Sequence, residues 1–247
     1  MRYAAVSALS HDGLVRDHNE DSVVAGAWTL CASVTASPQT LLFPLGEPIV
    51  VAVADGLGGH PAGELASSLV VQALARAEPG LTDEAAIAEA LLSCNQLIFE
   101  EAARDRERAA MGTTVAGLVL TDENVVTFNV GDSRVYAVGD ADLVQLSVDD
   151  NEPGLGGRRS PVLTQTLGGS HAKEPVEPHV TSRPLATPAR YLLCSDGLTD
   201  AVNDAMIAEI LAAHDGVRAV FELWRATIDA GAPDNVTVAV VEISSEP

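Results

Sequence analysis

The first part of the chain has hydrophobic patterns that predict β-strands. Residues 2–9 alternate weakly, and residues 22–34 are apolar and rich in β-branched side chains. Residues 49–54 form an uninterrupted apolar run, which is typical of a strand buried on both faces. Residues 36–48 contain three prolines and predict a connecting loop.

After residue 61 the hydrophobic period changes to that of a helix. The apolar positions between residues 65 and 74 fall on one helical face. Pro79 and Gly80 end that helix, and Thr82 or Asp83 can cap the next one. The apolar stripe of this second helix occupies residues 87–98, and the charged residues 100–108 are expected at its solvated end.

The second half of the chain repeats this order of strands followed by two helices. Short strands are predicted at residues 114–120, 125–130, 135–138, 143–146 and 190–194, and a last one at 236–243. Two helices are predicted between residues 200 and 230. Residues 147–180 have no clear period and are rich in glycine and proline, so we expect a functional lid or a mobile loop.

Strands in runs and helices in pairs favour antiparallel sheets with segregated helices over alternating βαβ units. We therefore predict an α+β fold, a two-sheet antiparallel β-sandwich flanked by helix pairs (αββα), with a flap between about residues 147 and 180. No linker is evident, so residues 1–247 are expected to form a single domain.

Charge is the compositional feature that narrows the function. The chain has 35 acidic residues against 14 lysines and arginines, a formal net charge of −21. This balance disfavours binding to nucleic-acid phosphates or to an anionic membrane, and it is compatible with a site for divalent cations. No apolar run has transmembrane length, and the N-terminus lacks the apolar segment of a signal peptide. Three widely spaced cysteines favour a reducing compartment, so a cytoplasmic location is expected.

Acidic residues recur where predicted strands end. Asp55 directly follows the buried run 49–54, and a single Asp-Gly pair there would most simply be a turn. The pattern is repeated by Asp132, Asp196 and Asp234, and by Glu20 and Asp21 in a loop. If these ends converge, the repulsion between carboxylates requires cations, and oxygen ligands favour Mg²⁺ or Mn²⁺. Two such ions can activate a water and clamp a phosphoryl group, whose oxygens Arg16 could bind.

Six short motifs contain these residues in order: Arg16-Asp17-His18-Asn19-Glu20-Asp21, Asp55-Gly56-Leu57-Gly58-Gly59-His60, Met111-Gly112-Thr113-Thr114, Gly131-Asp132-Ser133-Arg134, Ser195-Asp196-Gly197-Leu198 and Asp234-Asn235-Val236-Thr237. Together they resemble the metal-dependent protein phosphatase (PPM) family, the bacterial type 2C Ser/Thr protein phosphatases. The resemblance extends over about residues 6–243, with Leu57 where bacterial members carry methionine.

The resemblance implies a binuclear Mn²⁺ or Mg²⁺ centre, with a third, weaker ion in some bacterial members. Asp55 would bridge the two core ions, and the carbonyl of Gly56 would bind the first. Asp196 and Asp234 would hold the second ion. The nucleophile would be a hydroxide that bridges the ions, so no side chain would attack the phosphate.

The resemblance also suggests roles around this centre. Glu20 and Asp21 would act through metal-bound waters or by orienting their neighbours, and Asn235 would support the site. Asp132 would join Asp196 at the third ion, and Arg16 would bind the substrate phosphate.

His60 and the flap leave questions open. His60 could be the general acid for the leaving oxygen, or it could have a structural or substrate-contact role. His18 is expected to orient neighbouring acids. Family members often carry an Asp-His-Ser element after Gly-Asp-Ser-Arg, whereas this chain reads Asp149-Asp150-Asn151, so the resemblance does not imply a particular substrate.

The expected function is hydrolysis of phosphoserine and phosphothreonine on proteins by a monomer, reversing a bacterial Ser/Thr kinase. One alternative is a non-catalytic module that binds phosphoproteins. The retention of Asp55, Asp196 and Asp234 argues against it. A second alternative is an enzyme for small phosphomonoesters, which the sequence does not exclude.

Overall fold

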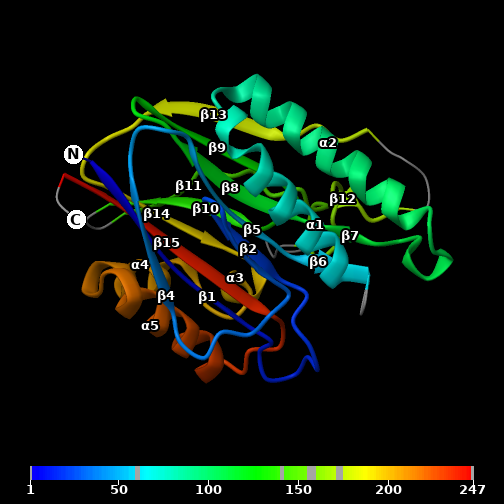
Figure 1. Cartoon of the computed structure of the whole chain (residues 1–247). Coiled ribbons are helices and arrows are strands. Elements are labelled where there is room, and N and C mark those ends of the chain that lie inside the picture. The colour runs from blue at the N-terminus through cyan, green and yellow to red at the C-terminus, as the bar shows by residue number, and fades with distance from the viewer. Residues whose placement is uncertain (1, 59–61, 140–141, 155–159, 171–174, 246–247) are drawn as a thin grey trace.

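Two large antiparallel sheets lie between two layers of helices (Figure 1). The computed structural model describes residues 2–58, 62–139, 142–154, 160–170 and 175–245. The predicted α+β sandwich with helices on its outer faces is confirmed.

The first sheet has the strand order β11-β10-β14-β15-β1-β4. At its centre β1 and β15 run antiparallel over nine residue pairs, from Tyr3 opposite Ser244 to His11 opposite Val236. The strands are β1 (Tyr3–His11), β4 (Gln39–Pro44), β10 (Arg134–Val138), β11 (Leu143–Gln145), β14 (Ala189–Cys194) and β15 (Val236–Ser244).

The second sheet has the order β13-β9-β8-β5-β2-β3, and a small third sheet has the order β12-β7-β6. The large sheet comprises β2 (Ser22–Ala25), β3 (Trp28–Cys31), β5 (Ile49–Ala54), β8 (Val115–Leu120), β9 (Asn124–Val130) and β13 (His179–Pro184). The small sheet comprises β6 (Gly56–Leu57), β7 (Gly112–Thr113) and β12 (Leu167–Gly168).

The helices cover the outer faces of the sandwich (Figure 1). Over the second sheet lie α1 (Ala62–Ala77) and α2 (Glu84–Ala102), with short 3₁₀ turns at Glu78–Gly80 and Arg106–Arg108. Over the first sheet lie α3 (Asp196–Thr199), α4 (Asp204–Ala213) and α5 (Gly216–Asp229). No helix of the described residues is both long enough and apolar enough to cross a membrane.

Strand β5 shows why the apolar run 49–54 is continuous. Val51 and Val53 belong to the core between the two sheets, whereas Val50 and Ala52 belong to the core beneath α1 and α2. All six residues of β5 are buried, as the sequence predicts for a strand covered on both faces. Asp55 therefore lies at the end of a fully buried strand.

Two strands of the large sheets lie where the sequence analysis expected none, as do the three short strands of the small sheet. Residues 36–48 were predicted to be a loop, but Gln39–Pro44 forms β4, which pairs with β1. The flap was expected to extend to residue 180, but His179–Pro184 forms β13, which pairs with β9. Both are edge strands with mostly exposed side chains, so they carry little hydrophobic signal and tolerate proline.

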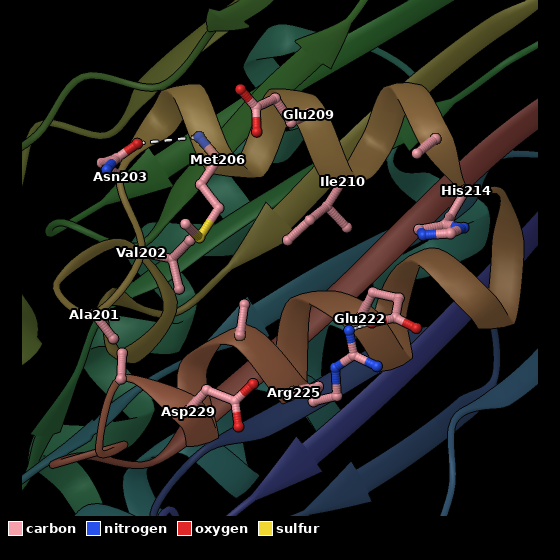
Figure 2. A pocket seen from close by; sticks show the side chains of 13 residues that line it. Ala201, Val202, Asn203, Met206, Glu209, Ile210, His214, Glu222, Arg225 and Asp229 are labelled. Atoms are coloured by element: carbon pink, nitrogen blue, oxygen red, sulfur yellow. Dashed lines mark hydrogen bonds and ion pairs between the residues drawn. The ribbon is translucent and has the colours of Figure 1, made fainter.

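A cavity of about 730 Å³ lies between α4 and α5, outside the first sheet (Figure 2). Met206 and Ile210 line it from α4, and Glu222 and Arg225 line it from α5. Asn203 caps α4 by accepting a hydrogen bond from the Met206 N–H at 3.0 Å. None of the acidic residues predicted to bind metal lines this cavity, so its size does not mark it as the site.

Candidate metal centre

Residues from four separate segments meet at a second, smaller cavity. It has a volume of about 240 Å³ and lies where β5 ends, where α3 begins, just before β15, and against the loop between β1 and β2. Its lining residues are Arg16, His18, Glu20, Asp55, Gly56, Leu57, Gly58, Asp196, Asp234 and Asn235. Seven of the site residues predicted from the sequence therefore lie around one cavity.

Asp55 and Asp196 are both half-buried, and each affects the pKa of the other. Burial, followed by the negative charges of Asp21 and Asp196, raises the pKa of Asp55 well above its usual value. Burial, followed by the negative charge of Asp132, raises the pKa of Asp196 to about 6. The negative charge of Asp196 thus disfavours ionisation of Asp55, because it brings two like charges together.

Asp21 lies behind this pair and is completely buried. Its Oδ2 accepts a hydrogen bond from Ser195 Oγ at 2.8 Å, and Ser195 Oγ accepts one from the Thr237 N–H at 3.0 Å. Its other oxygen, Oδ1, has no hydrogen-bond partner within the described part of the chain. Burial is the main cause that raises the pKa of Asp21 to about 7, against the opposing effect of the Ser195 hydrogen bond.

Two side-chain contacts lie where the loop between β1 and β2 lines the cavity. Arg16 donates from Nη2 to Asp234 Oδ2 at 2.7 Å, and both side chains are partly exposed. His18 Nε2 lies 2.8 Å from Glu20 Oε1. His18 thus contacts an acidic residue of the site, as its predicted orienting role requires.

Asn235 ties the loop to the start of β15. Its Oδ1 accepts a hydrogen bond from the Glu20 N–H at 2.8 Å. Its Nδ2 donates to the carbonyl oxygens of His18 at 2.9 Å and Asp12 at 3.1 Å. One buried amide therefore satisfies three backbone groups of the loop that carries Arg16 and Glu20.

Glycines allow α1 to approach the site closely, and Gly63 is one that the sequence analysis missed. A Cβ atom on Gly63 would lie 1.9 Å from Glu20 Oε2, and one on Gly56 would lie 2.4 Å from the Gly63 carbonyl oxygen. No side chain larger than hydrogen fits at either position without movement. Nothing in the local sequence distinguishes Gly63 from an ordinary glycine in the first turn of a helix.

Asp132 is buried at the turn after β9, outside the residues that line the 240 Å³ cavity. Its Oδ2 accepts a hydrogen bond from Asn151 Nδ2 at 2.9 Å. Its charge and that of Asp200 both act on Asp196, so the three carboxylates form a group beside the cavity. Asp200 is a neighbour of the site that the sequence analysis missed.

The sequence departs from the family pattern at Asp149-Asp150-Asn151. Each of these three residues makes a hydrogen bond to a different residue of the Gly131–Arg134 turn. Asp149 Oδ2 accepts from Arg134 Nη2 at 2.6 Å, and Asp150 Oδ2 accepts from the Gly131 N–H at 2.9 Å. Asn151 binds Asp132, as described above. We call this segment the strap.

Comparison with known proteins decides the family. The sequence profile described as Protein phosphatase 2C matches residues 44–236. The chain belongs to the protein phosphatase 2C family. The predicted resemblance to bacterial type 2C Ser/Thr phosphatases is therefore confirmed.

Two curated relatives of this protein phosphatase 2C chain are Ser/Thr phosphatases of bacteria. It is 34% identical over 259 residues to Serine/threonine protein phosphatase PstP of Mycobacterium tuberculosis, covering 98% of this chain and 45% of the relative. The chain thus spans about half the length of PstP. It is 31% identical over 251 residues to Serine/threonine phosphatase stp of Listeria innocua, covering 93% of this chain and 92% of the relative.

A solved structure with the same fold contains metal. The catalytic domain of serine/threonine protein phosphatase PstP, crystallised in complex with two manganese ions, matches with a TM-score of 0.81. The two sequences are 32% identical, and the match covers 99% of this chain and all of that one.

The acids of this protein phosphatase 2C chain fit a cation chemically, although they are not yet arranged around one. Among the described residues, no three His, Cys, Asp or Glu side chains form a group that could hold an ion as they stand. Asp55 and Asp196 repel each other, and Asp234 is paired with Arg16. The partnerless buried Oδ1 of Asp21 and the raised pKa values of Asp55 and Asp196 are what oxygen ligands show when no cation offsets their charge.

His60 lies outside the described residues. The two roles considered for it therefore stay predictions.

Proposed function

We propose that this chain hydrolyses phosphoserine and phosphothreonine on proteins in a reaction that depends on Mn²⁺ or Mg²⁺. The observation that carries this proposal is the convergence of Asp55, Asp196, Asp234 and Arg16 on one cavity, in a chain of the protein phosphatase 2C family. Three carboxylates suit hard divalent cations, and a guanidinium suits the oxygens of a phosphate.

In this proposal the core ions are held by Asp55 and the carbonyl of Gly56 on one side and by Asp196 and Asp234 on the other. When bound, the ions would neutralise charge on the phosphoryl group and lower the pKa of water, so that hydroxide is available as the nucleophile near neutral pH. Asp132 would serve a third, weaker ion together with Asp196. The two manganese ions in the PstP structure support divalent-cation binding by this fold.

The remaining residues bind and position. In this structure the Arg16 guanidinium contacts the Asp234 carboxylate. An ion bound at Asp234 would compete for that carboxylate and leave the guanidinium available to bind the phosphate. Asn235 fixes the backbone of the loop that presents Arg16 and Glu20. Ser195 fixes the direction of the Asp21 carboxylate. Glu20 and Asp21 would act through waters or by orienting these ligands.

The names of the relatives support protein substrates. PstP and stp are both called serine/threonine phosphatases, so we propose a bacterial Ser/Thr kinase as the enzyme whose products this chain removes. We further propose a single catalytic domain that acts as a monomer. We also propose a cytoplasmic location, because the three cysteines are free thiols, as is usual in a reducing compartment.

The test is hydrolysis of a phosphothreonine peptide with Mn²⁺ and with chelator. We expect turnover only with the metal. Asp196→Asn should abolish most of it, because a charged ligand is replaced by a neutral one. Asp122→Asn, a change of the same kind at an exposed surface pair with Arg2, should not. Near-normal activity of Asp196→Asn in excess Mn²⁺ would refute the assignment of Asp196.

Two other results would favour the alternatives. Faster turnover of small phosphoesters than of phosphopeptides at the same metal concentration would favour a small-molecule phosphatase. Binding of phosphopeptide without turnover in any divalent cation, by a folded protein, would favour a phosphoprotein-binding module.

A further inference from the structure

Two apolar side chains next to Arg16 are unusually exposed. Leu14 has 60% and Val15 67% of its surface accessible, whereas every other exposed large hydrophobic residue in the described part of the chain lies between 46% and 53%. Leu14 and Val15 are also consecutive, and Arg16 follows them directly. The two most exposed apolar side chains therefore adjoin the residue proposed to bind phosphate.

The exposure does not come from a loosely attached loop. The Leu14 N–H donates to the Ala232 carbonyl oxygen at 2.9 Å, and the Gly13 N–H donates to His11 Nδ1 at 2.9 Å. Gly13 has a positive φ of 77°, and a Cβ there would lie 2.2 Å from the Asp234 carbonyl oxygen. The backbone at Gly13 thus packs against the residue that pairs with Arg16, and the Leu14 N–H holds the start of the Leu14-Val15 pair at this position.

The residue types are also unexpected for their position. Leu14 and Val15 lie in a turn, where glycine, proline, asparagine, aspartate and serine are the usual choices. A turn of polar residues would connect β1 to β2 equally well. Apolar side chains held rigidly in water beside a ligand site are typical of a contact surface for that ligand.

We propose that Leu14 and Val15 form an apolar subsite for the substrate residues that flank the phosphorylated serine or threonine. The subsite would favour phosphopeptides with a bulky aliphatic residue within about three positions of the phosphorylated one. This inference rests on the proposed phosphatase function.

The reach of a peptide fits this arrangement. Consecutive Cα atoms are about 3.8 Å apart, so the Cα of Leu14 lies at most about 7.6 Å from that of Arg16. An extended peptide advances about 3.3 Å per residue, so it covers that span in two to three residues on either side of the phosphate.

The test compares two phosphothreonine peptides of equal length and charge that carry either leucine or serine at the flanking positions. Wild-type protein in Mn²⁺ should prefer the leucine peptide by about tenfold in kcat/KM, mainly through KM, as expected for contacts of methylene size. In the double variant Leu14→Ser/Val15→Thr the two peptides should be hydrolysed with about equal efficiency.

Two matched variants separate recognition from structure. Leu14→Met/Val15→Ile keeps apolar bulk and should keep the preference. Leu92→Ser/Val144→Thr makes comparable changes at exposed apolar positions on α2 and β11, and should keep it too. Equal hydrolysis of both peptides by wild-type protein, or a preference that survives in Leu14→Ser/Val15→Thr, would overturn the inference while leaving the phosphatase function standing. If wild-type protein with Mn²⁺ hydrolyses neither peptide and does not hydrolyse para-nitrophenyl phosphate, the proposed function is overturned, and the subsite with it.

Discussion

Ser195 is the residue whose role the structure clarifies most. It precedes Asp196, and a serine next to an acidic site could be read as a nucleophile. Its hydroxyl proton is committed to Asp21 Oδ2 at 2.8 Å, and its oxygen accepts from the Thr237 N–H. Ser195 is also completely buried, so its hydroxyl cannot reach a substrate phosphate. Ser195 therefore positions a carboxylate, which agrees with a mechanism that uses no side-chain nucleophile.

Replacement of Arg16 should weaken the binding of substrate. Arg16→Ala should raise KM for a phosphothreonine peptide by about tenfold, because a charge-assisted pair with the phosphate is lost, and should affect kcat less. Arg16→Lys keeps the charge but loses the planar guanidinium, so its KM should lie between those of the wild type and Arg16→Ala. Steady-state kinetics in Mn²⁺ measure this, and an unchanged KM in Arg16→Ala would count against phosphate binding by Arg16.

At the scale of elements, the strap joins both sheets to one turn. Asp149 pairs with Arg134 on β10 of the first sheet, and Asp150 contacts His179 on β13 of the second at 2.8 Å. Asp150 also accepts from Gln165 Nε2 at 3.0 Å within the flap. The segment that lacks the family's Asp-His-Ser element thus anchors the flap beside Asp132.

Removing Asp150 should loosen this anchor. Asp150 is buried, and Asp150→Ala leaves the Gly131 N–H and the Gln165 amide without their acceptor. We expect the free energy of unfolding to fall by about 2–3 kcal/mol, as when buried hydrogen-bonding groups lose their partners. Denaturant unfolding measures this, and hydrogen exchange should show faster exchange of the flap amides. Glu47→Ala, at an exposed position, is the control, and an equal effect of both changes would contradict the anchor.

The elements that the sequence predicted well are those whose burial leaves a pattern. The run 49–54 is apolar because β5 is covered on both faces, and the acid that follows it marks the site. Edge strands β4 and β13 leave no such pattern, since most of their side chains are exposed. The roles of Gly63, Asp200 and the strap depend on contacts between segments far apart in the chain, which spacing along one sequence does not reveal.

At the scale of the whole molecule, the fold concentrates charge that it does not neutralise. The chain has 35 acidic residues and 14 lysines and arginines, and it buries Asp21 completely beside Asp55 and Asp196. Without a cation, protons are the only species that can relieve this repulsion in the interior. A rise in pH should therefore lower the stability of the metal-free protein, whereas binding of a cation should raise it.

The sign follows from the shifted groups. The usual pKa of aspartate is 3.8, and burial raises the pKa of Asp21 to about 7 and that of Asp196 to about 6. The folded metal-free protein then binds more protons than the unfolded chain between about pH 4 and 7. The stability contributed by these protons is complete below the unfolded pKa and is lost as the pH rises through 6 and 7.

We therefore expect the Tm in chelator to fall between pH 5 and 8. Mn²⁺ competes with protons for the same oxygens, so the rise in Tm that it causes should grow over the same range. Asp55→Asn removes one carboxylate from the group and should flatten the fall in chelator while losing most of the gain with Mn²⁺. Thermal unfolding at several pH values, with chelator and with Mn²⁺, measures both effects. A Tm in chelator that is flat or rising over this range, or a gain with Mn²⁺ that is equal in the two proteins, would mean that these buried acids do not bind the cation.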